Sequence, residues 1–251
     1  MSGLPPNWRP AQDELKNKTI LITGATGGIG RAVALACARL GAEVLLTGRN
    51  EAALESVYDT ILNEGGRTPG LIPFDLRVTQ HEPYDELAET LLAEGLAIDG
   101  LVHNAGVLGE RRALSQTSPE SWQEVLQVNI TATFLLTRAL MPLLERASLA
   151  SIVLTSSGVG RRGKAFWGAY AVSKFATEGY MQVLADELGG TSSIRVNSLN
   201  PGAVNTRMRR AAYPGEPPDS NPLPEALTDN WVYLLSDASA LIHGKALSAQ
   251  G

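Results

Sequence analysis

Two side chains that could pass a proton to and from a substrate, Tyr170 and Lys174, are four residues apart. They open a helical pattern, so the phenol and the ammonium should share one helix face, where the cation can act on the hydroxyl. A free tyrosine, with a pKa of about 10, is a poor acid or base at neutral pH. Because a neighbouring cation favours the phenolate, we expect the pKa of Tyr170 to be lowered toward the working range.

Two further polar residues could complete such a site. Ser157 ends an apolar, strand-like run, and its hydroxyl could donate to a reacting carbonyl. Ser156 is the alternative, but side chains alternate along a strand and should direct it to the opposite face. Asn129 lies inside a long helical pattern, where asparagine is disfavoured, so either simple exposure or a water-mediated proton relay to Lys174 would explain it.

A glycine-rich turn, residues 23–30, follows the first apolar run directly and leads into a helical pattern. Gly24 permits the tight turn, Gly28 lets the backbone approach a pyrophosphate, and Gly30 allows close packing of helix and sheet. The helix N-terminus supplies unpaired N–H groups and a positive dipole end. Flexible glycine loops are common, but this position favours dinucleotide binding. The candidate cofactor-binding residues here are Gly24, Thr26, Gly28, Ile29 and Gly30.

After the second apolar run, residues 47–50 lack the carboxylate that would hold the ribose hydroxyls of NAD. Gly48 removes a charge that would repel a 2′-phosphate, and the Arg49 guanidinium can pair with one. A solvated arginine at a helix start is the alternative. The sequence therefore predicts that NADP(H) is preferred and that NAD(H) is possible.

More candidates follow the third and fourth apolar runs, because ligands of α/β folds bind at the carboxyl ends of the strands. Asp75 could accept from an adenine amino group. These candidates are Asp75, Leu76, Asn104, Ala105 and Gly106.

Positioning these residues requires a sheet, and short apolar runs alternate with longer helical patterns along the whole chain. The pattern predicts an α/β fold, a single-domain doubly wound (Rossmann) parallel sheet of about seven strands with helices on both faces. The expected strands are residues 19–23, 43–47, 71–74, 98–103, 151–156, 194–199 and 245–248. The expected helices are about residues 28–40, 50–64, 82–94, 118–146, 168–189 and 225–236.

Three segments depart from the regular pattern. Residues 1–16 precede the first strand as an N-terminal extension of the single domain 1–251. Pro142 should kink or locally break the helix expected over residues 118–146. Residues 207–224 are rich in proline without periodicity, which predicts a long surface loop on the substrate side, either a lid or a passive insertion.

Composition excludes several classes of protein. The net charge of −5 argues against a nucleic-acid binder, and no apolar run approaches the roughly 20 residues that span a bilayer. Three scattered histidines show no metal-ligand spacing, and the single Cys37 lies in an apolar helical stretch as a packed side chain. We therefore expect no bound metal. Because the first residues do not have the pattern of a signal peptide, we expect a cytoplasmic protein.

The motifs together resemble the short-chain dehydrogenases and reductases of the Tyr-x-x-x-Lys type over essentially the whole chain. The matching positions are residues 23–30, residues 103–106, Asn129, Ser157, residues 170–174, Pro201-Gly202 and Val204-Asn205-Thr206. Residues 156–161, 167–179 and 181–188 look most like the YciK-type bacterial branch of this family. His103 replaces a commoner asparagine, and the short proline-rich segment after Thr206 puts the usual substrate-loop helices in doubt.

The resemblance implies roles for particular residues. Lys174 would also hold the nicotinamide ribose, Asn129 would order a relay water, and Val204 and Thr206 would contact the carboxamide, with Pro201 and Gly202 in the same cofactor loop. It also implies hydride transfer from the B face and assembly as a homodimer or homotetramer. We expect the subunits to pair through outward apolar helix faces formed by Phe134, Leu135, Leu140, Phe175, Met181 and Leu184.

The sequence thus predicts an NADP(H)-dependent oxidoreductase that interconverts a small-molecule carbonyl and its alcohol, with Asn129, Ser157, Tyr170 and Lys174 as catalytic residues. A cofactor-sensing or interaction protein is one alternative, although such proteins tend to lose a catalytic group. A sugar-nucleotide epimerase or dehydratase is another, although these generally need a longer substrate domain after the last strand. Candidates for lining the substrate pocket are Leu108, Arg111, Arg162, Phe166 and Trp167.

Overall fold

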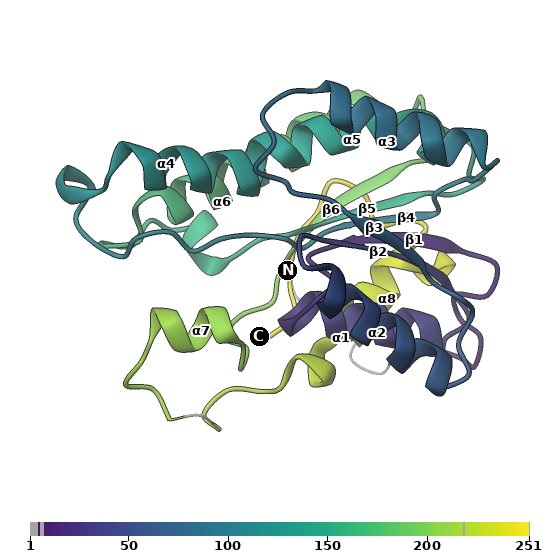
Figure 1. Cartoon of the computed structure of the whole chain (residues 1–251), viewed down its shortest axis with the longest axis horizontal. Coiled ribbons are helices and arrows are strands. Elements are labelled where there is room, and N and C mark those ends of the chain that lie inside the picture. The colour runs from purple at the N-terminus through teal and green to yellow at the C-terminus, as the bar shows by residue number, and fades with distance from the viewer. Residues whose placement is uncertain (1–4, 6–7, 218, 251) are drawn as a thin grey trace.

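The strands form one parallel sheet with the order β3-β2-β1-β4-β5-β6-β7 in the computed structural model (Figure 1), which describes residues 5, 8–217 and 219–250. The order reverses between β1 and β4, which leaves a crevice at their carboxyl ends. The strand bounds are β1 Thr19–Thr23, β2 Glu43–Gly48, β3 Gly70–Pro73, β4 Gly100–His103, β5 Ser151–Thr155, β6 Arg195–Asn200 and β7 Ala246–Ser248.

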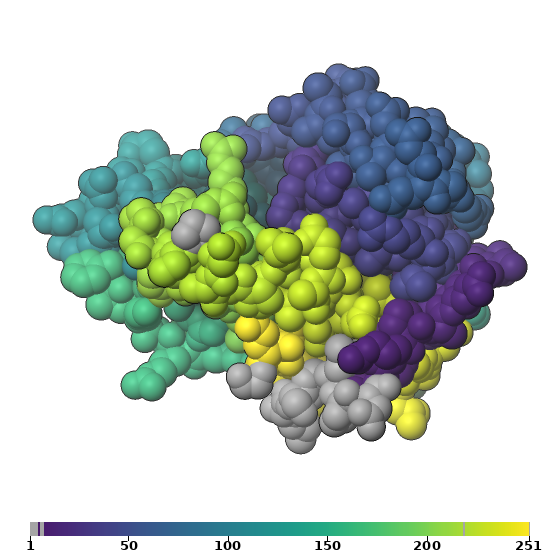
Figure 2. All heavy atoms as spheres, turned by 90° about the horizontal axis from the view of Figure 1, so that it is seen from below, coloured from purple at the N-terminus to yellow at the C-terminus, as the bar shows by residue number. Residues whose placement is uncertain are grey.

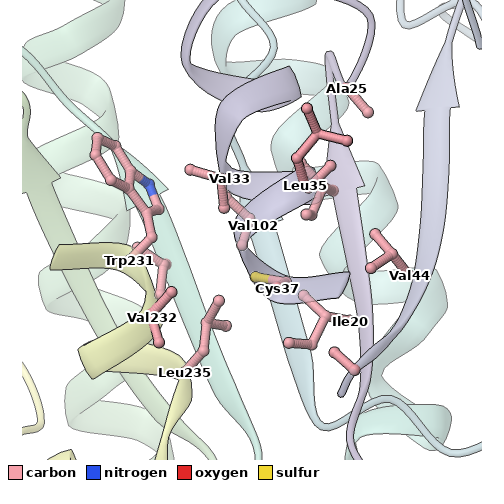
Figure 3. Packing of buried hydrophobic residues seen from close by; sticks show 14 of the residues in the cluster. Ile20, Ala25, Val33, Leu35, Cys37, Val44, Val102, Trp231, Val232 and Leu235 are labelled. Atoms are coloured by element: carbon pink, nitrogen blue, oxygen red, sulfur yellow. The ribbon is translucent and has the colours of Figure 1, made fainter. Parts of the chain in front are cut away.

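Helices cover both faces of this sheet, which confirms the predicted doubly wound fold (Figure 1). One layer contains α1 Gly28–Arg39, α2 Glu51–Asn63 and α8 Asp229–Leu235. The other contains α3 Glu82–Ala93, α4 Pro119–Leu126, α5 Ala132–Glu145 and α6 Gly168–Leu188. Each layer packs its own apolar core against the sheet, and Figure 3 shows Trp231 and Val232 of α8 beside Val33 of α1. Cys37 is fully buried in this core, as predicted.

The long helix predicted over residues 118–146 is divided at a different place from the expected one. A π-helical turn, Gln127–Thr131, separates α4 from α5, while Pro142 lies inside α5 without interrupting it. Proline removes one backbone hydrogen bond, but the neighbouring Leu140 and Leu143 are fully buried, so tertiary packing holds the helix together. The irregular turn instead contains Asn129.

The segment 207–224 is not a loop throughout, and this prediction was wrong for its first six residues. They form the short helix α7, Arg207–Ala212, and the Thr206 hydroxyl caps it by accepting from the backbone N–H of Arg209 at 3.1 Å. Prolines begin only at Pro214, so nothing in residues 207–212 opposes a helix. A 3-10 helix, Pro224–Leu227, follows and leads into α8. In Figure 2 the yellow-green segment around α7 forms a lobe on the face seen from below.

The predicted outward apolar faces of α5 and α6 are also largely wrong. Phe134 and Phe175 are exposed by 47% and 45%. The other four side chains, Leu135, Leu140, Met181 and Leu184, are buried in the core beneath these helices. A helix that packs on a sheet turns most of its apolar stripe inward, and sequence periodicity alone does not say which face that is.

Part of the N-terminal extension packs on the domain. Leu15 is fully buried, and the Trp8 and Tyr233 rings form a T-shaped pair with centroids 5.1 Å apart. Among the described residues, none of the helices combines the length and apolar character needed to cross a bilayer. Within the same residues, no three His, Cys, Asp or Glu side chains gather as metal ligands would.

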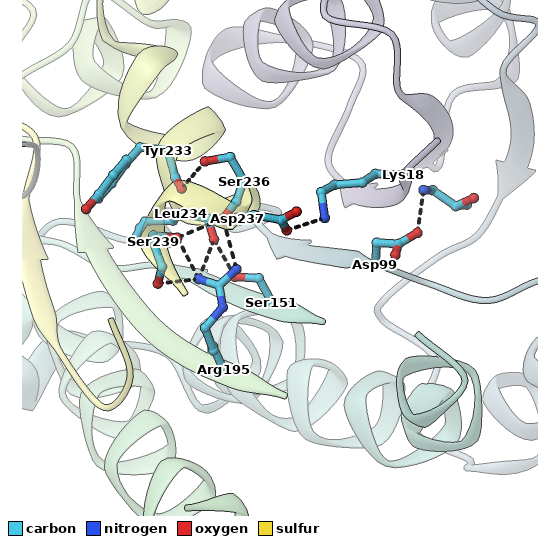
Figure 4. A network of polar contacts seen from close by, with 10 residues as sticks. Lys18, Asp99, Ser151, Arg195, Tyr233, Leu234, Ser236, Asp237 and Ser239 are labelled. Carbon is cyan, nitrogen blue, oxygen red and sulfur yellow. Dashed lines mark hydrogen bonds and ion pairs between the residues drawn. The ribbon is translucent and has the colours of Figure 1, made fainter. Parts of the chain in front are cut away.

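A buried arginine ties the end of α8 to the start of β6, the strand next to the edge strand β7 (Figure 4). Arg195 begins β6 and is only 4% exposed. Its guanidinium donates to the carbonyl oxygens of Leu234, Ser236 and Ser239, at 3.1, 3.2 and 3.0 Å. These carbonyls end α8 and form the turn after it. Each also accepts from a second donor, Ser151 Oγ for Leu234, Ser239 Oγ for Ser236 and the Ile242 N–H for Ser239, so Arg195 adds to a hydrogen-bonded helix end. Arg195 therefore strengthens a helix end that no water could reach easily.

We predict that Arg195→Met lowers the free energy of unfolding by about 3 kcal/mol or more, because it removes several buried hydrogen bonds from a charged donor, each of which contributes roughly 1.5–3 kcal/mol. Methionine keeps most of the apolar stem, so the loss should come from the missing donors. Urea unfolding followed by circular dichroism would measure it.

Arg146→Met is the matched control. Arg146 also donates to two carbonyl oxygens, those of Leu92 and Leu96, but it is exposed, and water can replace it. Arg146→Met should lower the free energy of unfolding by no more than about 0.5 kcal/mol. Equal losses for the two variants would contradict the role given to Arg195.

Candidate active site

A cavity of about 430 Å³ opens at the carboxyl ends of the central strands, where the strand order reverses. Of the predicted catalytic and cofactor-binding residues, all but Gly30 and Asn129 line this cavity. The lining residues that the sequence predicted are Gly24, Thr26, Gly28, Ile29, Arg49, Asp75, Leu76, Asn104, Ala105, Gly106, Ser157, Tyr170, Lys174, Pro201, Gly202, Val204 and Thr206. The structure therefore brings together segments from almost the whole chain.

The glycine-rich turn has the geometry that a phosphate cradle needs. Gly24 has a φ of +69°, which favours glycine, and a Cβ on Gly30 would overlap the carbonyl oxygen of Gly24 and come within 2.5 Å of Asn104 Nδ2. The backbone of the turn is thus packed too closely for side chains at these points. The first residues of α1, Gly28 and Ile29, line the cavity, so the helix start with its unpaired N–H groups lies at the cavity and fits the pyrophosphate of a dinucleotide.

Thr23 joins this turn to the loop after β4 and was missed by the sequence analysis. Its Oγ1 accepts from the backbone N–H groups of Asn104 and Ala105, both at 3.0 Å. Asn104 adds a hydrogen bond from Nδ2 to the Thr23 carbonyl oxygen at 3.3 Å. A threonine ending a buried strand beside a glycine turn was the available signal.

Arg49 lies at one end of the cavity, beside Thr26 and Gly48, and is exposed. Within the part of the chain that the structure describes, no carboxylate forms an ion pair with its guanidinium. Asp75 lines the same end and accepts from the backbone N–H of Arg77 at 3.0 Å through Oδ1, which leaves Oδ2 for another donor. This end of the cavity can hold the adenosine half of a dinucleotide.

Tyr170 and Ser157 meet inside the cavity, as the sequence predicted. Tyr170 is 8% exposed, and its hydroxyl shares a hydrogen bond with Ser157. Ser156 instead donates to the buried Glu178 carboxylate at 2.5 Å, so the choice of Ser157 over Ser156 agrees with the alternation of strand side chains.

The pKa of Tyr170 departs from the expectation. Burial raises it above the usual value of 10.0, and the hydrogen bond with Ser157 offsets this only in part. The Lys174 ammonium is 5.8 Å from the centroid of the phenol ring and donates instead to the Thr155 carbonyl oxygen at 2.7 Å. Tyr170 is therefore a protonated phenol at neutral pH in this structure, ready to act as a proton donor.

Lys174 carries a charge inside the protein. It is 5% exposed, and burial lowers its pKa to about 8, while the Glu178 carboxylate acts to raise it. His103 lies close to it at the end of β4, and burial together with the Lys174 charge lowers the pKa of His103 to about 3. The imidazole is therefore neutral and forms a 2.8 Å hydrogen bond with Thr137, which gives His103 a place in the core.

Glu178 completes this set of charges and was also missed by the sequence analysis. It is 6% exposed, and its carboxylate accepts from Ser198 Oγ at 2.6 Å as well as from Ser156. Arg161 forms an ion pair with it at 3.1 Å. Tyr170, Lys174 and Glu178 follow one another at intervals of four on α6, and this repeated spacing was the signal to extend the pair to a third residue.

Asn129 lies behind the cavity wall, in the π-helical turn, and is only 3% exposed, so simple exposure is not the reason for it. Its Oδ1 accepts from the Val107 N–H at 2.8 Å, and its Nδ2 donates to the Val107 carbonyl oxygen and to Ser173 Oγ, both at 3.0 Å. Asn129 thus fixes the loop after β4 to α6. The water relay through it stays a prediction.

The loop after β6 closes the other side of the cavity. Pro201, Gly202, Val204 and Thr206 line it, and Gln250 Nε2 braces the loop by donating to the carbonyl oxygens of Pro201 and Ala203 at 2.7 and 2.8 Å. Of the five expected pocket-lining residues, Leu108 and Trp167 line the cavity. The other three, Arg111, Arg162 and Phe166, are exposed and do not line the cavity.

A family model described as short chain dehydrogenase matches residues 18–217, which include all but the last strand of the sheet. The chain belongs to the short-chain dehydrogenase family. Its relatives in this family include the uncharacterized oxidoreductase YciK of Escherichia coli strain K12, which is 46% identical over 97% of this chain and 96% of that protein. This likeness confirms the predicted resemblance to the YciK-type branch.

Two further members of the short-chain dehydrogenase family are informative. The crystal structure of a short-chain dehydrogenase from Escherichia coli CFT073 complexed with NADPH has a TM-score of 0.94 and 46% identity, and covers 96% of this chain and 100% of that chain. The cyclopentanol dehydrogenase of Comamonas testosteroni is 30% identical over 94% of this chain and 97% of its own length. The chain is thus an oxidoreductase of this family, with a relative known in complex with NADPH.

Proposed function

We propose that this short-chain dehydrogenase interconverts a small-molecule carbonyl compound and its alcohol by hydride transfer with NADP(H), with Tyr170 as the general acid and base. The observation that carries the proposal is that Tyr170, Ser157 and Lys174 lie together in one cavity, which the glycine-rich turn also lines. The name of the cyclopentanol dehydrogenase relative supports an alcohol–carbonyl reaction.

In the direction of reduction, the bound cofactor supplies the hydride, and the chain manages the proton and the developing charge. Ser157 can donate a hydrogen bond to the substrate oxygen, which orients the carbonyl beside Tyr170. The Tyr170 hydroxyl, kept protonated by burial, gives its proton to that oxygen. The Lys174 ammonium then stabilises the phenolate that remains, and Asn129 holds the loop and helix that frame this exchange.

The cofactor-sensing alternative needs a site in which chemistry has been lost. Tyr170, Ser157 and Lys174 all line one cavity, and Asn129 is fixed directly behind it, so an enzyme is the better interpretation.

We also propose that the protein is a cytoplasmic homodimer or homotetramer, in which the exposed Phe134 and Phe175 contribute to subunit contacts. The segment 207–224 is proposed as a lid, now with α7 as its first part, because Met208 and Ala212 line the cavity. Its helix cap at Thr206 would act as the fixed end.

The preference for NADP(H) rests on Arg49. We predict that Arg49→Ala weakens NADPH binding by about ten- to a hundredfold and NADH binding far less, since a charge-assisted contact with the 2′-phosphate would be lost. Titration with each cofactor would measure both affinities. Arg77→Ala is the control, because Arg77 is an exposed arginine near the same sheet edge that pairs with Glu124 outside the cavity. Equal losses for both cofactors would exclude the phosphate role of Arg49.

We predict that Tyr170→Phe reduces turnover by about 10² to 10⁴, the range expected for a positioned acid, while NADPH affinity hardly changes. The variant removes one oxygen and keeps the buried ring. Single-turnover hydride transfer, together with NADPH titration, separates the two effects.

Tyr180→Phe, on the same helix but outside the cavity lining, is the matched control and should keep near-normal turnover. Lys174→Ala should impair turnover and NADPH binding together, because one ammonium serves the phenol and the ribose. Retention of more than about a tenth of wild-type turnover in Tyr170→Phe would be inconsistent with general-acid catalysis by this residue.

The pKa of Lys174 predicts the pH dependence of the reaction. Because this pKa is lowered to about 8, the ammonium is present below that pH, and kcat/KM for reduction should fall as the pH rises through about 8. Glu178→Gln keeps the size of the side chain but removes the charge that raises the pKa of Lys174, so the fall should move to lower pH. Glu187→Gln, exposed on the same helix, should leave the profile unchanged. An identical profile in Glu178→Gln would refute the coupling.

A further inference from the structure

The substrate side of the cavity has an apolar wall next to the catalytic phenol. Trp167, Tyr170, Ala171 and Ala212 are buried together in a cluster of their own, apart from the two cores on the sheet. The Trp167 ring is 5.7 Å from the Tyr170 ring, centroid to centroid, and 5.8 Å from the Tyr213 ring. A line of aromatic rings therefore leads from the reaction centre outward to Tyr213.

Cations from three separate segments, two loops and the helix α7, converge at the outer end of this line. Arg111, in the loop after β4, lies 4.6 Å from the centroid of Trp167 and 5.1 Å from that of Tyr213. Lys164, after β5, donates to the Tyr213 hydroxyl at 3.0 Å. Arg209, in α7, stacks on the Tyr213 ring at 3.9 Å and lines the cavity. The hydrogen bond from Lys164, with the charges of Lys164, Arg209 and Arg111, lowers the pKa of Tyr213.

These positive charges are only partly balanced. Glu216 pairs with Arg209 through two hydrogen bonds, at 2.6 and 2.7 Å. Among the residues that the structure describes, no carboxylate forms an ion pair with Arg111 or Lys164. Arg111, Lys164 and Arg209 surround one phenol ring, and a carboxylate pairs with Arg209 alone, so the positive charges repel one another although the net charge of the protein is −5. A bound anion would relieve this repulsion, and its approach would be favoured by the local field.

We propose that the substrate of this enzyme carries an anionic group, a carboxylate or a phosphate, separated by an apolar segment from the reacting carbonyl. The inference rests on the proposed function for the carbonyl at Tyr170. The apolar segment would lie against Trp167 and Met208, both of which line the cavity, and the anion would bind Arg111 and Lys164. Arg111 can present its guanidinium while it stacks on the aromatic rings.

Matched pairs of aldehydes test this directly. The probes are 4-carboxybenzaldehyde, its uncharged methyl ester methyl 4-formylbenzoate, and 4-formylphenyl phosphate, each reduced with NADPH. We expect kcat/KM to favour the anions over the ester by about tenfold or more, the effect of one charge-assisted contact. The ratio of kcat/KM for each anion to kcat/KM for the ester should fall as salt is added, because salt screens the charges. Comparison of the carboxylate with the phosphate identifies the preferred anion.

The double variant Arg111→Gln with Lys164→Gln should bring the ratio of anion to ester close to one, with NADPH affinity unchanged. Arg112→Gln is the control, because Arg112 is a neighbouring arginine that pairs with Glu110 instead of the aromatic rings. If the double variant weakened NADPH and left the ratio intact, the cations would serve the cofactor, and the proposal would be overturned.

Failure of the anion site and failure of the reductase reaction give different results. Reduction of the ester and the anions at equal kcat/KM would overturn the anion site and leave the reductase function standing. If no probe were reduced, calorimetry in the presence of NADPH would compare 4-(hydroxymethyl)benzoate with its methyl ester. Tighter binding of the acid, lost in the double variant, would support the anion site alone, whereas equal affinity, or none for either, would overturn it.

Discussion

The ammonium of Lys174 is buried, and most of the catalytic geometry depends on keeping it charged. Removing an ammonium from water is costly unless hydrogen bonds and an opposite charge replace the solvent. The carbonyl oxygen of Thr155 accepts from it, and the Glu178 carboxylate lies one helical turn further along α6. Glu178 is held in turn by Ser156 and Arg161, which follow β5, and by Ser198, which lies within β6. Lys174 is thus linked to the sheet through Glu178, a carboxylate that does not line the cavity.

The strand-order reversal between β1 and β4 decides where this charged centre meets a ligand. Loops from both halves of the sheet end at the same edge, so the glycine cradle and Arg49 lie at one end of the cavity and the aromatic wall at the other. Positive charge is placed at both ends, although the chain as a whole is acidic. Such a distribution suits two anionic partners, a dinucleotide and the anionic substrate proposed above, with an apolar region between them where hydride transfer is protected from water.

Irregular backbone occurs where the site needs it. The π-helical turn around Asn129 places an amide side chain against the Val107 backbone, and π-turns of this kind are frequent at functional sites. The loop after β6 leads into α7, which the Thr206 hydroxyl caps, and Gln250 holds the start of that loop. Both features position the walls of the cavity, to which they contribute Val128 and Val204.

The sequence by itself determined the parallel sheet, the residues at its carboxyl edge and the pairing of Tyr170 with Lys174. These depend on local spacing, because continuous apolar runs fix buried parallel strands and a four-residue interval fixes a helix face. Tertiary structure alone decided the raised pKa of Tyr170, the partners of Asn129 and the meeting of Arg111, Lys164 and Arg209 around Tyr213. Burial and contacts between distant loops set these properties, and no pattern within one segment encodes how deeply a side chain is buried or which distant segment it meets.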